Sequence, residues 1–148
     1  MNTSVHWHID RQPTGPAIQE LRQRLAAFNA AHSRIAEESE FAIFLRDDHD
    51  RLLGGVVGSV WGRVLEIDFL WVSDELRGQG YGSWLLTAVE AEGARRSCEV
   101  AVLDTYSFQA PEFYHKHGYE VYGVVEGYPD QQRKYFMKKR LAPHVDLP

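Results

Sequence analysis

The sequence predicts an α/β protein in which helices lie on both faces of a mixed, mostly antiparallel central sheet. Three observations support this class. Apolar residues in 17–31 recur at helical spacing, three β-forming runs follow one another between residues 41 and 72, and a helical run then separates the last of these from another strand. A strand, a helix and a strand in succession imply a parallel crossover, so one strand pair of the sheet is expected to be parallel.

The first predicted elements are a short strand and a helix. Residues 5–9 alternate between apolar and polar side chains, which predicts the strand. A segment with two prolines and a glycine then interrupts the chain. In residues 17–31 the apolar side chains are three or four positions apart and line one face of a helix: Ile18, Leu21, Leu25 and Phe28.

An antiparallel meander is predicted next. Residues 41–45, 52–61 and 64–72 are short runs rich in β-branched, aromatic and other apolar residues. A polar turn at 46–50 and the tight connection Gly62-Arg63 link them. Connections this short join neighbouring antiparallel strands.

The second half of the chain completes the order β-α-β-β-β-α-β-α-β-β. It contains an amphipathic helix, a buried-type strand at 99–103 and a short helix at 110–117, which Gly118 ends as a C-terminal cap. Runs at 119–125 and 134–138 are expected to form a final hairpin.

Length and composition indicate one globular domain spanning residues 1–148. Hydrophobic residues make up 44% and charged residues 25%, as is usual for globular domains. The formal net charge of -5 argues against a nucleic-acid partner and suits a cationic one, such as an amine. The same charge would also serve simply to keep a small protein soluble.

We expect a cytoplasmic protein without a bound metal. The single Cys98 cannot form an internal disulfide, and the first ten residues lack the apolar core of a signal peptide. No run approaches the roughly 18 apolar residues of a membrane span. His6 and His8 lack an evident third ligand, and His115 and His117 point to different sides of a helix.

The most informative segment is Arg77-Gly78-Gln79-Gly80-Tyr81-Gly82, between a predicted strand and a predicted helix. The free N–H groups at a helix N-terminus attract anions, and glycines let the backbone approach a pyrophosphate closely. Arg77 adds a positive charge. The spacing matches neither the loop of nucleoside triphosphatases nor the dinucleotide-binding fingerprint. Taken alone, such glycines could also form a turn that binds nothing.

In its context this segment resembles the acyl-coenzyme A loop of the Gcn5-related N-acetyltransferases (GNAT). The loop pattern Arg-x-x-Gly-x-Gly lies at 77–82. Residues 110–119, with Phe113-Tyr114 ahead of Gly118-Tyr119, resemble the family's second signature. The resemblance covers roughly residues 41–141. It implies the family's fold, with a splayed parallel pair of strands, and transfer of an acetyl group from acetyl-coenzyme A (acetyl-CoA) to an amine.

The resemblance also implies a cofactor site between the splayed strands, at 64–72 and 99–103. Backbone groups of Leu70 and Val72 would hold the pantetheine arm and polarise the acetyl carbonyl. Ser107 stands where many members have an asparagine that contacts pantetheine, and its hydroxyl is expected to bond there instead. The implied cofactor-binding residues are Leu70, Trp71, Val72, Arg77, Gly78, Gln79, Gly80, Tyr81, Gly82, Ser83 and Ser107.

The same resemblance suggests the catalytic groups. Tyr114 stands where the family commonly places the proton donor to the leaving sulfur, or else it steadies the pantetheine. Glu66 lies where some members carry a glutamate that accepts the amine's proton, and Asp68 shares its face of the strand. Either carboxylate, or both together, would act as the base, or they attract a cationic substrate. Cys98 is expected to pack in the interior, so transfer is direct, in a ternary complex.

We therefore expect an enzyme that acetylates a primary amine of a small molecule. Two alternatives remain open. One is a protein acetyltransferase acting on a lysine or an N-terminus, which would need an extended groove across the splayed strands. The other is a non-catalytic module that senses acyl-coenzyme A. A homodimer is possible.

Overall fold

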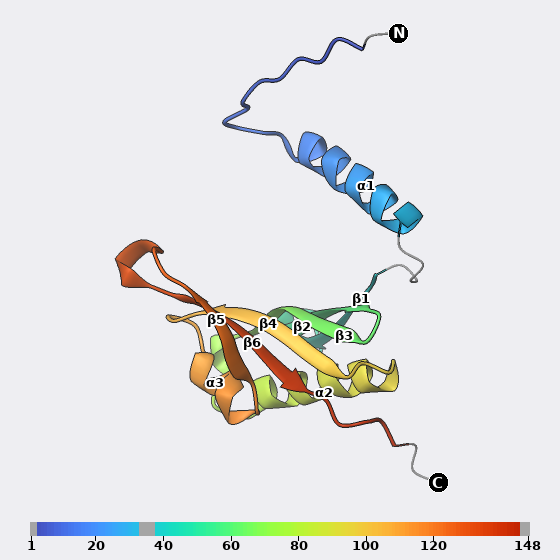
Figure 1. Cartoon of the computed structure of the whole chain (residues 1–148). Helices are drawn as coiled ribbons and strands as arrows, with labels where there is room; N and C mark the ends of the chain where they lie inside the picture. Colours follow the sequence, from blue (N-terminus) through green and yellow to red (C-terminus); the bar gives the residue numbers. More distant parts are fainter. Residues whose placement is uncertain (1–2, 33–37, 146–148) are drawn as a thin grey trace. The chain divides into compact units, whose positions relative to one another are not determined.

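The computed structural model describes residues 3–32 and 38–145 of the chain, shown in Figure 1. These residues belong to two compact units, Met1–Ala36 and Glu37–Pro148. The expectation of a single domain over 1–148 stays a prediction.

The first unit contains one helix, α1 (Gly15–His32), which confirms the helix predicted for 17–31. The hydroxyl of Thr14 accepts a hydrogen bond from the Ala17 amide (3.4 Å), so this threonine caps the first turn. Residues 5–9 form no strand, and that prediction is wrong. Alternation alone does not make a strand, because its backbone groups need a partner strand, and the described part of this unit has none.

The second unit is a six-stranded sheet in the order β1-β2-β3-β4-β6-β5. All neighbouring strands are antiparallel except β3 and β4, which confirms the mixed, mostly antiparallel α/β class. Its elements, in chain order, are β1 (Ser39–Arg46), β2 (Leu52–Trp61), β3 (Val64–Val72), the 3-10 turn η1 (Asp74–Leu76), α2 (Tyr81–Arg95), β4 (Val100–Tyr106), α3 (Pro111–Lys116), β5 (Glu120–Val125), the 3-10 turn η2 (Pro129–Gln131) and β6 (Lys134–Arg140).

The core lies between the sheet and α2, which packs on β1, β2 and β3 (Figure 1). Three side chains of α2 are fully buried in this core: Leu85, Leu86 and Val89. Gly93 makes the approach close, because a Cβ atom there would lie 2.8 Å from a methyl carbon of Leu65. Cys98 is buried in this core, as the sequence suggests for a packing residue.

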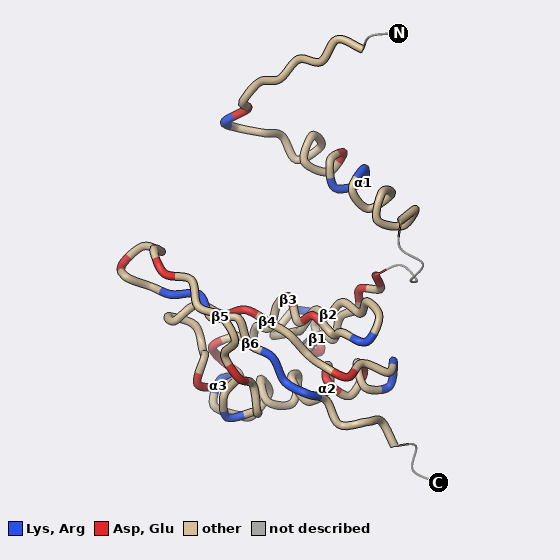
Figure 2. Tube along the Cα trace, in the orientation of Figure 1, with Lys and Arg blue, Asp and Glu red and all other residues tan. Residues whose placement is uncertain are grey.

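Charged residues are spread over the elements of this unit (Figure 2). The longest basic run, Lys138-Lys139-Arg140, lies near the end of β6. Lys139 is not a free cation, because its ammonium group pairs with Glu90 of α2 at 2.9 Å.

Two irregularities of β3 create the space for a site. The strand bulges at Asp68, since Val57 of β2 pairs with Phe69 while Gly58 pairs with Ile67. In addition, β3 pairs with β4 only from Val64 to Glu66, although both strands continue beyond. The parallel pair is therefore splayed, as expected.

The strand predicted at 99–103 is longer than expected, because β4 extends to Tyr106. Its other neighbour explains the extension. β6 pairs with β4 along its whole length, up to Tyr106 opposite Lys134, and so stabilises residues that β3 has already left.

Candidate active site

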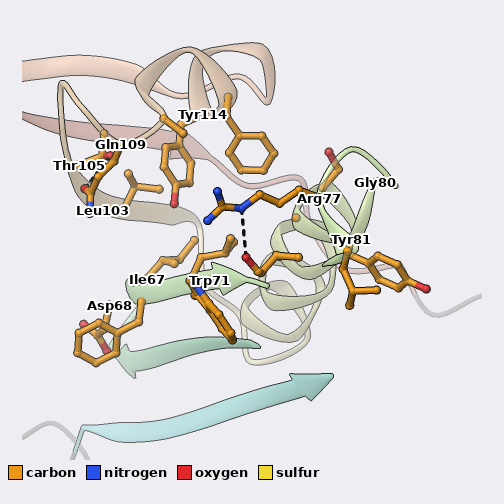
Figure 3. A pocket seen from close by; sticks show the side chains of 18 of the residues that line it. Ile67, Asp68, Trp71, Arg77, Gly80, Tyr81, Leu103, Thr105, Gln109 and Tyr114 are labelled. Atoms are coloured by element: carbon orange, nitrogen blue, oxygen red, sulfur yellow. Dashed lines mark hydrogen bonds between the residues drawn. The ribbon is translucent and has the colours of Figure 1, made fainter. Parts of the chain in front are cut away.

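A pocket of about 930 Å³ opens where β3 and β4 part (Figure 3). Its size is within the range of small-molecule and cofactor sites. The walls come from the second half of β3, the loop that leads into α2, the end of β4, the segment after β4, and α3. Residues far apart in the sequence thus meet around one cavity.

The loop before α2 is built to expose backbone amides. Gly78 (φ 73°) and Gly80 (φ 85°) have left-handed backbone conformations that other residues resist. Gly80 is the N-cap of α2, and the first helical bond runs from the Trp84 amide to the Gly80 carbonyl (3.0 Å). The amides at the start of α2, of Gly82 and its neighbours, precede that bond and are free to bind an anion.

Arg77 reaches from this loop across the end of β3 (Figure 3). Its guanidinium donates to the Val72 carbonyl at 3.4 Å and pairs with Asp74 at 2.9 Å. The side chain remains largely exposed, and it lines the pocket together with Gly80 and Gly82.

Tyr114 of α3 points its hydroxyl into the pocket (Figure 3). Among the described residues, no side chain or backbone group forms a hydrogen bond with that hydroxyl. Burial raises the pKa of Tyr114 above its ordinary value near 10, so the group keeps its proton at neutral pH.

The two candidate bases lie differently around the bulge. Asp68 lines the pocket, and its carboxylate accepts a hydrogen bond from the Ser59 hydroxyl (2.8 Å). Glu66 lies outside the pocket wall. Burial raises the pKa of Glu66, and the negative charges of Asp68, Glu38 and Asp104 raise it further. Both roles stay predictions, since the contacts alone do not distinguish a base from a group that attracts cations.

Two of the predicted cofactor-binding residues do not line the pocket; all the others do. The Gln79 side chain donates instead to the carbonyl of Glu75 (2.9 Å). Ser107 faces the segment between β5 and β6, where its oxygen accepts from the amide of Arg133 (2.9 Å) and its hydroxyl donates to Gln132.

The sequence analysis did not predict the part of the wall that is formed by the end of β4 beyond Leu103 and by the segment after it. The buried Thr105 donates to the side-chain oxygen of Gln109 (3.2 Å), which also accepts from the Tyr106 amide (2.9 Å). Asp104 and the exposed Phe108 stand beside them in the wall. A strand extended to Tyr106 would have revealed this wall, because Leu103 and Thr105 then share one face.

The model of the acetyltransferase (GNAT) family matches residues 3–119, and the chain belongs to this family. A related protein from Streptomyces morookaense, blasticidin-S acetyltransferase, is 33% identical to this chain over 102 residues, which are 68% of this chain and 75% of that protein. The crystal structure of an acetyltransferase from Bacillus cereus is 36% identical, covers 91% of this chain and 98% of its own, and has a TM-score of 0.75.

A third structure, an aminoglycoside 6'-N-acetyltransferase complexed with coenzyme A, shares the fold. It is 22% identical with a TM-score of 0.62, and covers 72% of this chain and 76% of its own. The family and these relatives together show that the protein is an N-acetyltransferase.

Two negative findings concern the described residues alone. In 3–32 and 38–145 no three histidine, cysteine or acidic side chains are grouped as a metal ion would require. Within the same ranges no helix has the length and apolar character needed to cross a membrane.

Proposed function

We propose that this enzyme transfers the acetyl group of acetyl-CoA to a primary amine of a small molecule. One observation carries the proposal. A single pocket joins the anion-binding start of α2, the hydroxyl of Tyr114 and the carboxylate of Asp68 through a gap in the sheet. Together they offer a site for the cofactor's pyrophosphate, a proton donor for the leaving sulfur and a proton acceptor for the amine.

The residues present fit the cofactor. Free amides at the start of α2 and the Arg77 cation suit a pyrophosphate. Beyond Glu66 the edge of β3 that faces β4 is unpaired, so backbone groups of Leu70 and Val72 are available to the amides of the pantetheine arm. The Val72 carbonyl would then exchange its long bond from Arg77 for one from the cofactor.

In the proposed reaction a neutral amine attacks the acetyl carbonyl, so that a C–N bond forms and the C–S bond breaks. Tyr114 gives its proton to the departing sulfur. The amine's proton passes to Glu66, through water, or to Asp68 on the pocket wall. The raised pKa of Tyr114 keeps its hydroxyl protonated at neutral pH, and the raised pKa of Glu66 makes this carboxylate a stronger base than an ordinary glutamate.

The surroundings of the pocket support a cationic small molecule as the acceptor. Phe69 and Phe108 line it with exposed rings, and aromatic faces together with carboxylates attract ammonium groups. Among the ion pairs of the described residues, none includes Glu66 or Asp68. The name of the Streptomyces relative, which refers to blasticidin S, is consistent with a small-molecule acceptor.

The first test is calorimetric titration of the protein with acetyl-CoA, together with a free-thiol assay over a panel of amines. Binding with thiol release for one class of small amine is the expected result. Release only with peptides bearing a lysine or a free N-terminus would favour a protein acetyltransferase. Binding without any release would favour a sensing module, and no binding would refute the cofactor site.

The cytoplasmic location, the absence of a nucleic-acid partner and the possible homodimer stay predictions.

A further inference from the structure

A partly buried polar network lies outside the residues that line the pocket. The side chain of Tyr119, just after α3, is 0% exposed, and its hydroxyl donates to a carboxylate oxygen of Glu90 in α2 (2.9 Å). The Lys139 ammonium group, from β6, donates to both oxygens of the same carboxylate (3.1 and 2.9 Å). Three separate elements therefore meet at one ionic hydrogen-bond network.

The ring of Tyr119 touches the proposed proton donor. Its centre lies 5.9 Å from that of Tyr114, in an edge-to-face arrangement at 75°. The backbones are joined as well, because the Tyr119 amide donates to the Tyr114 carbonyl at 3.1 Å. On its other side Tyr114 meets the ring of Phe113, with centres 5.1 Å apart.

Helix α3 is unable to orient Tyr114 by itself. It has six residues, none of them fully buried, and a single isolated turn and a half is unstable in water. The orientation of the Tyr114 ring must therefore come from its neighbours. Both neighbouring rings lie against α2. A Cβ atom on Gly82, near the start of the helix, would lie 3.5 Å from the Phe113 ring, and Tyr119 is hydrogen-bonded to Glu90, about two turns further along.

Tyr119 is chemically suited to hold rather than to react. Burial and the adjacent charge of Glu90 raise the pKa of Tyr119 far above its ordinary value, so it remains a permanent hydrogen-bond donor. It does not line the pocket, and its side chain is fully buried.

We propose that Tyr119, held by Glu90 and Lys139, is a positioning residue that orients Tyr114 toward the leaving sulfur. The proposal rests on the function proposed above. In this proposal α2 positions both parts of the site. Its N-terminus holds the cofactor's pyrophosphate, and its middle orients the proton donor Tyr114 through Tyr119.

The test is a double-mutant cycle with Tyr114→Phe and Tyr119→Phe in the full-length protein. Tyr119→Phe keeps the ring that supports Tyr114 but removes the bond to Glu90. We expect kcat to fall about tenfold, because small displacements of a catalytic group are costly, while the Kd for acetyl-CoA stays within about twofold. In the Tyr114→Phe background the second substitution should lower kcat no further. Independent, multiplying losses would overturn the positioning role.

A second measurement does not depend on catalysis. The protein is labelled with 3-fluorotyrosine, and the fluorine NMR signal of Tyr114 is identified by its loss in Tyr114→Phe. Tyr119→Phe should move that signal, whereas the control Tyr122→Phe, an exposed tyrosine of β5, should leave it in place. An unmoved Tyr114 signal in Tyr119→Phe would refute the proposal. A moved signal with full turnover in Tyr114→Phe would instead refute the acid role of Tyr114 and keep the structural coupling.

If Tyr119→Phe fails to fold, Glu90→Gln replaces it in both measurements. This variant keeps the shape of the side chain and weakens the bonds to Tyr119 and Lys139. The same loss of kcat and the same shift of the Tyr114 signal are expected. Wild-type values for both would overturn the proposal.

Discussion

Replacing Gly80 by alanine tests whether the loop before α2 depends on its left-handed backbone conformation and not on the space around it. Gly80 has φ 85°, and a Cβ atom there would meet nothing within 4 Å. The substitution therefore introduces no clash. Its effect is conformational, because an L-residue in the left-handed region is disfavoured by about 1–2 kcal/mol.

The loop has room to relieve this strain, since residues 77–80 are exposed. We expect the free protein to relax into another backbone conformation, in which the amides at the start of α2 no longer converge. Binding of acetyl-CoA must then restore the strained conformation. A cost of about 1–2 kcal/mol corresponds to a Kd that is roughly 5- to 30-fold higher.

The assay is calorimetric titration of wild type and Gly80→Ala with acetyl-CoA and with acetyl-pantetheine, which lacks the pyrophosphate. Only the affinity for acetyl-CoA should fall. Gly62→Ala is the matched control, because Gly62 has φ 59°, equal freedom from contacts, and a position in the turn between β2 and β3. It should lose stability in urea without any change in Kd.

Two results would refute this reasoning. An unchanged Kd for acetyl-CoA in Gly80→Ala would mean that the loop amides do not hold the pyrophosphate. Equal loss of affinity in Gly62→Ala would mean that the effect arises from general destabilisation.

Three further predictions concern the acid, the base and the core. Tyr114→Phe should lower kcat by about 100-fold or more while the Kd for acetyl-CoA stays constant, as calorimetry and steady-state kinetics would show; undiminished turnover would exclude the acid role. Because the pKa of Glu66 is raised, the activity of the wild type should decline as the pH falls through a value above 4.5, the pKa of an ordinary glutamate. Glu66→Gln should be slow at all pH values and should lack that decline. A decline that survives in the variant would point to Asp68 as the base. The same shift makes the charged form of Glu66 unfavourable in the fold, so Glu66→Gln should be more stable than wild type at pH 7 and not at pH 3, measured by urea unfolding. Gly93→Ala should reduce the free energy of unfolding by about 1–2 kcal/mol, since overpacking against the fully buried Leu65 outweighs the helix propensity that alanine gains; an equal or higher urea midpoint would contradict the close contact.

Local patterns predicted most of the elements. The helical spacing of 17–31 corresponds to α1, the three β-forming runs to β1, β2 and β3, and the alternating glycines to the loop before α2. Gly118 ends α3 with φ 89°, the conformation expected of a C-terminal cap. These features are encoded within a few neighbouring residues, so they can be seen without knowledge of the fold.

Predictions that depended on partners elsewhere in the chain were less successful. Residues 5–9 alternate as a strand does but have no strand to pair with in the described part of their unit. The strand at 99–103 continues to Tyr106 because β6, some thirty residues later, pairs with it. Strand length is set by a neighbour, and a single sequence does not show which neighbour that is.

By itself, the sequence of this protein determined the mixed, mostly antiparallel α/β class of fold, the glycine-rich loop before α2 and the candidate groups Tyr114, Glu66 and Asp68. Only the tertiary structure decided how they meet. It placed Asp68 on the pocket wall and Glu66 outside it, turned Ser107 away, and added Thr105 and Gln109. It also tied Tyr119 to Glu90 and Lys139. The physical reason is that a bulge, the divergence of two strands and an ionic network arise from contacts between distant segments. A loop or helix pattern, in contrast, depends on adjacent residues.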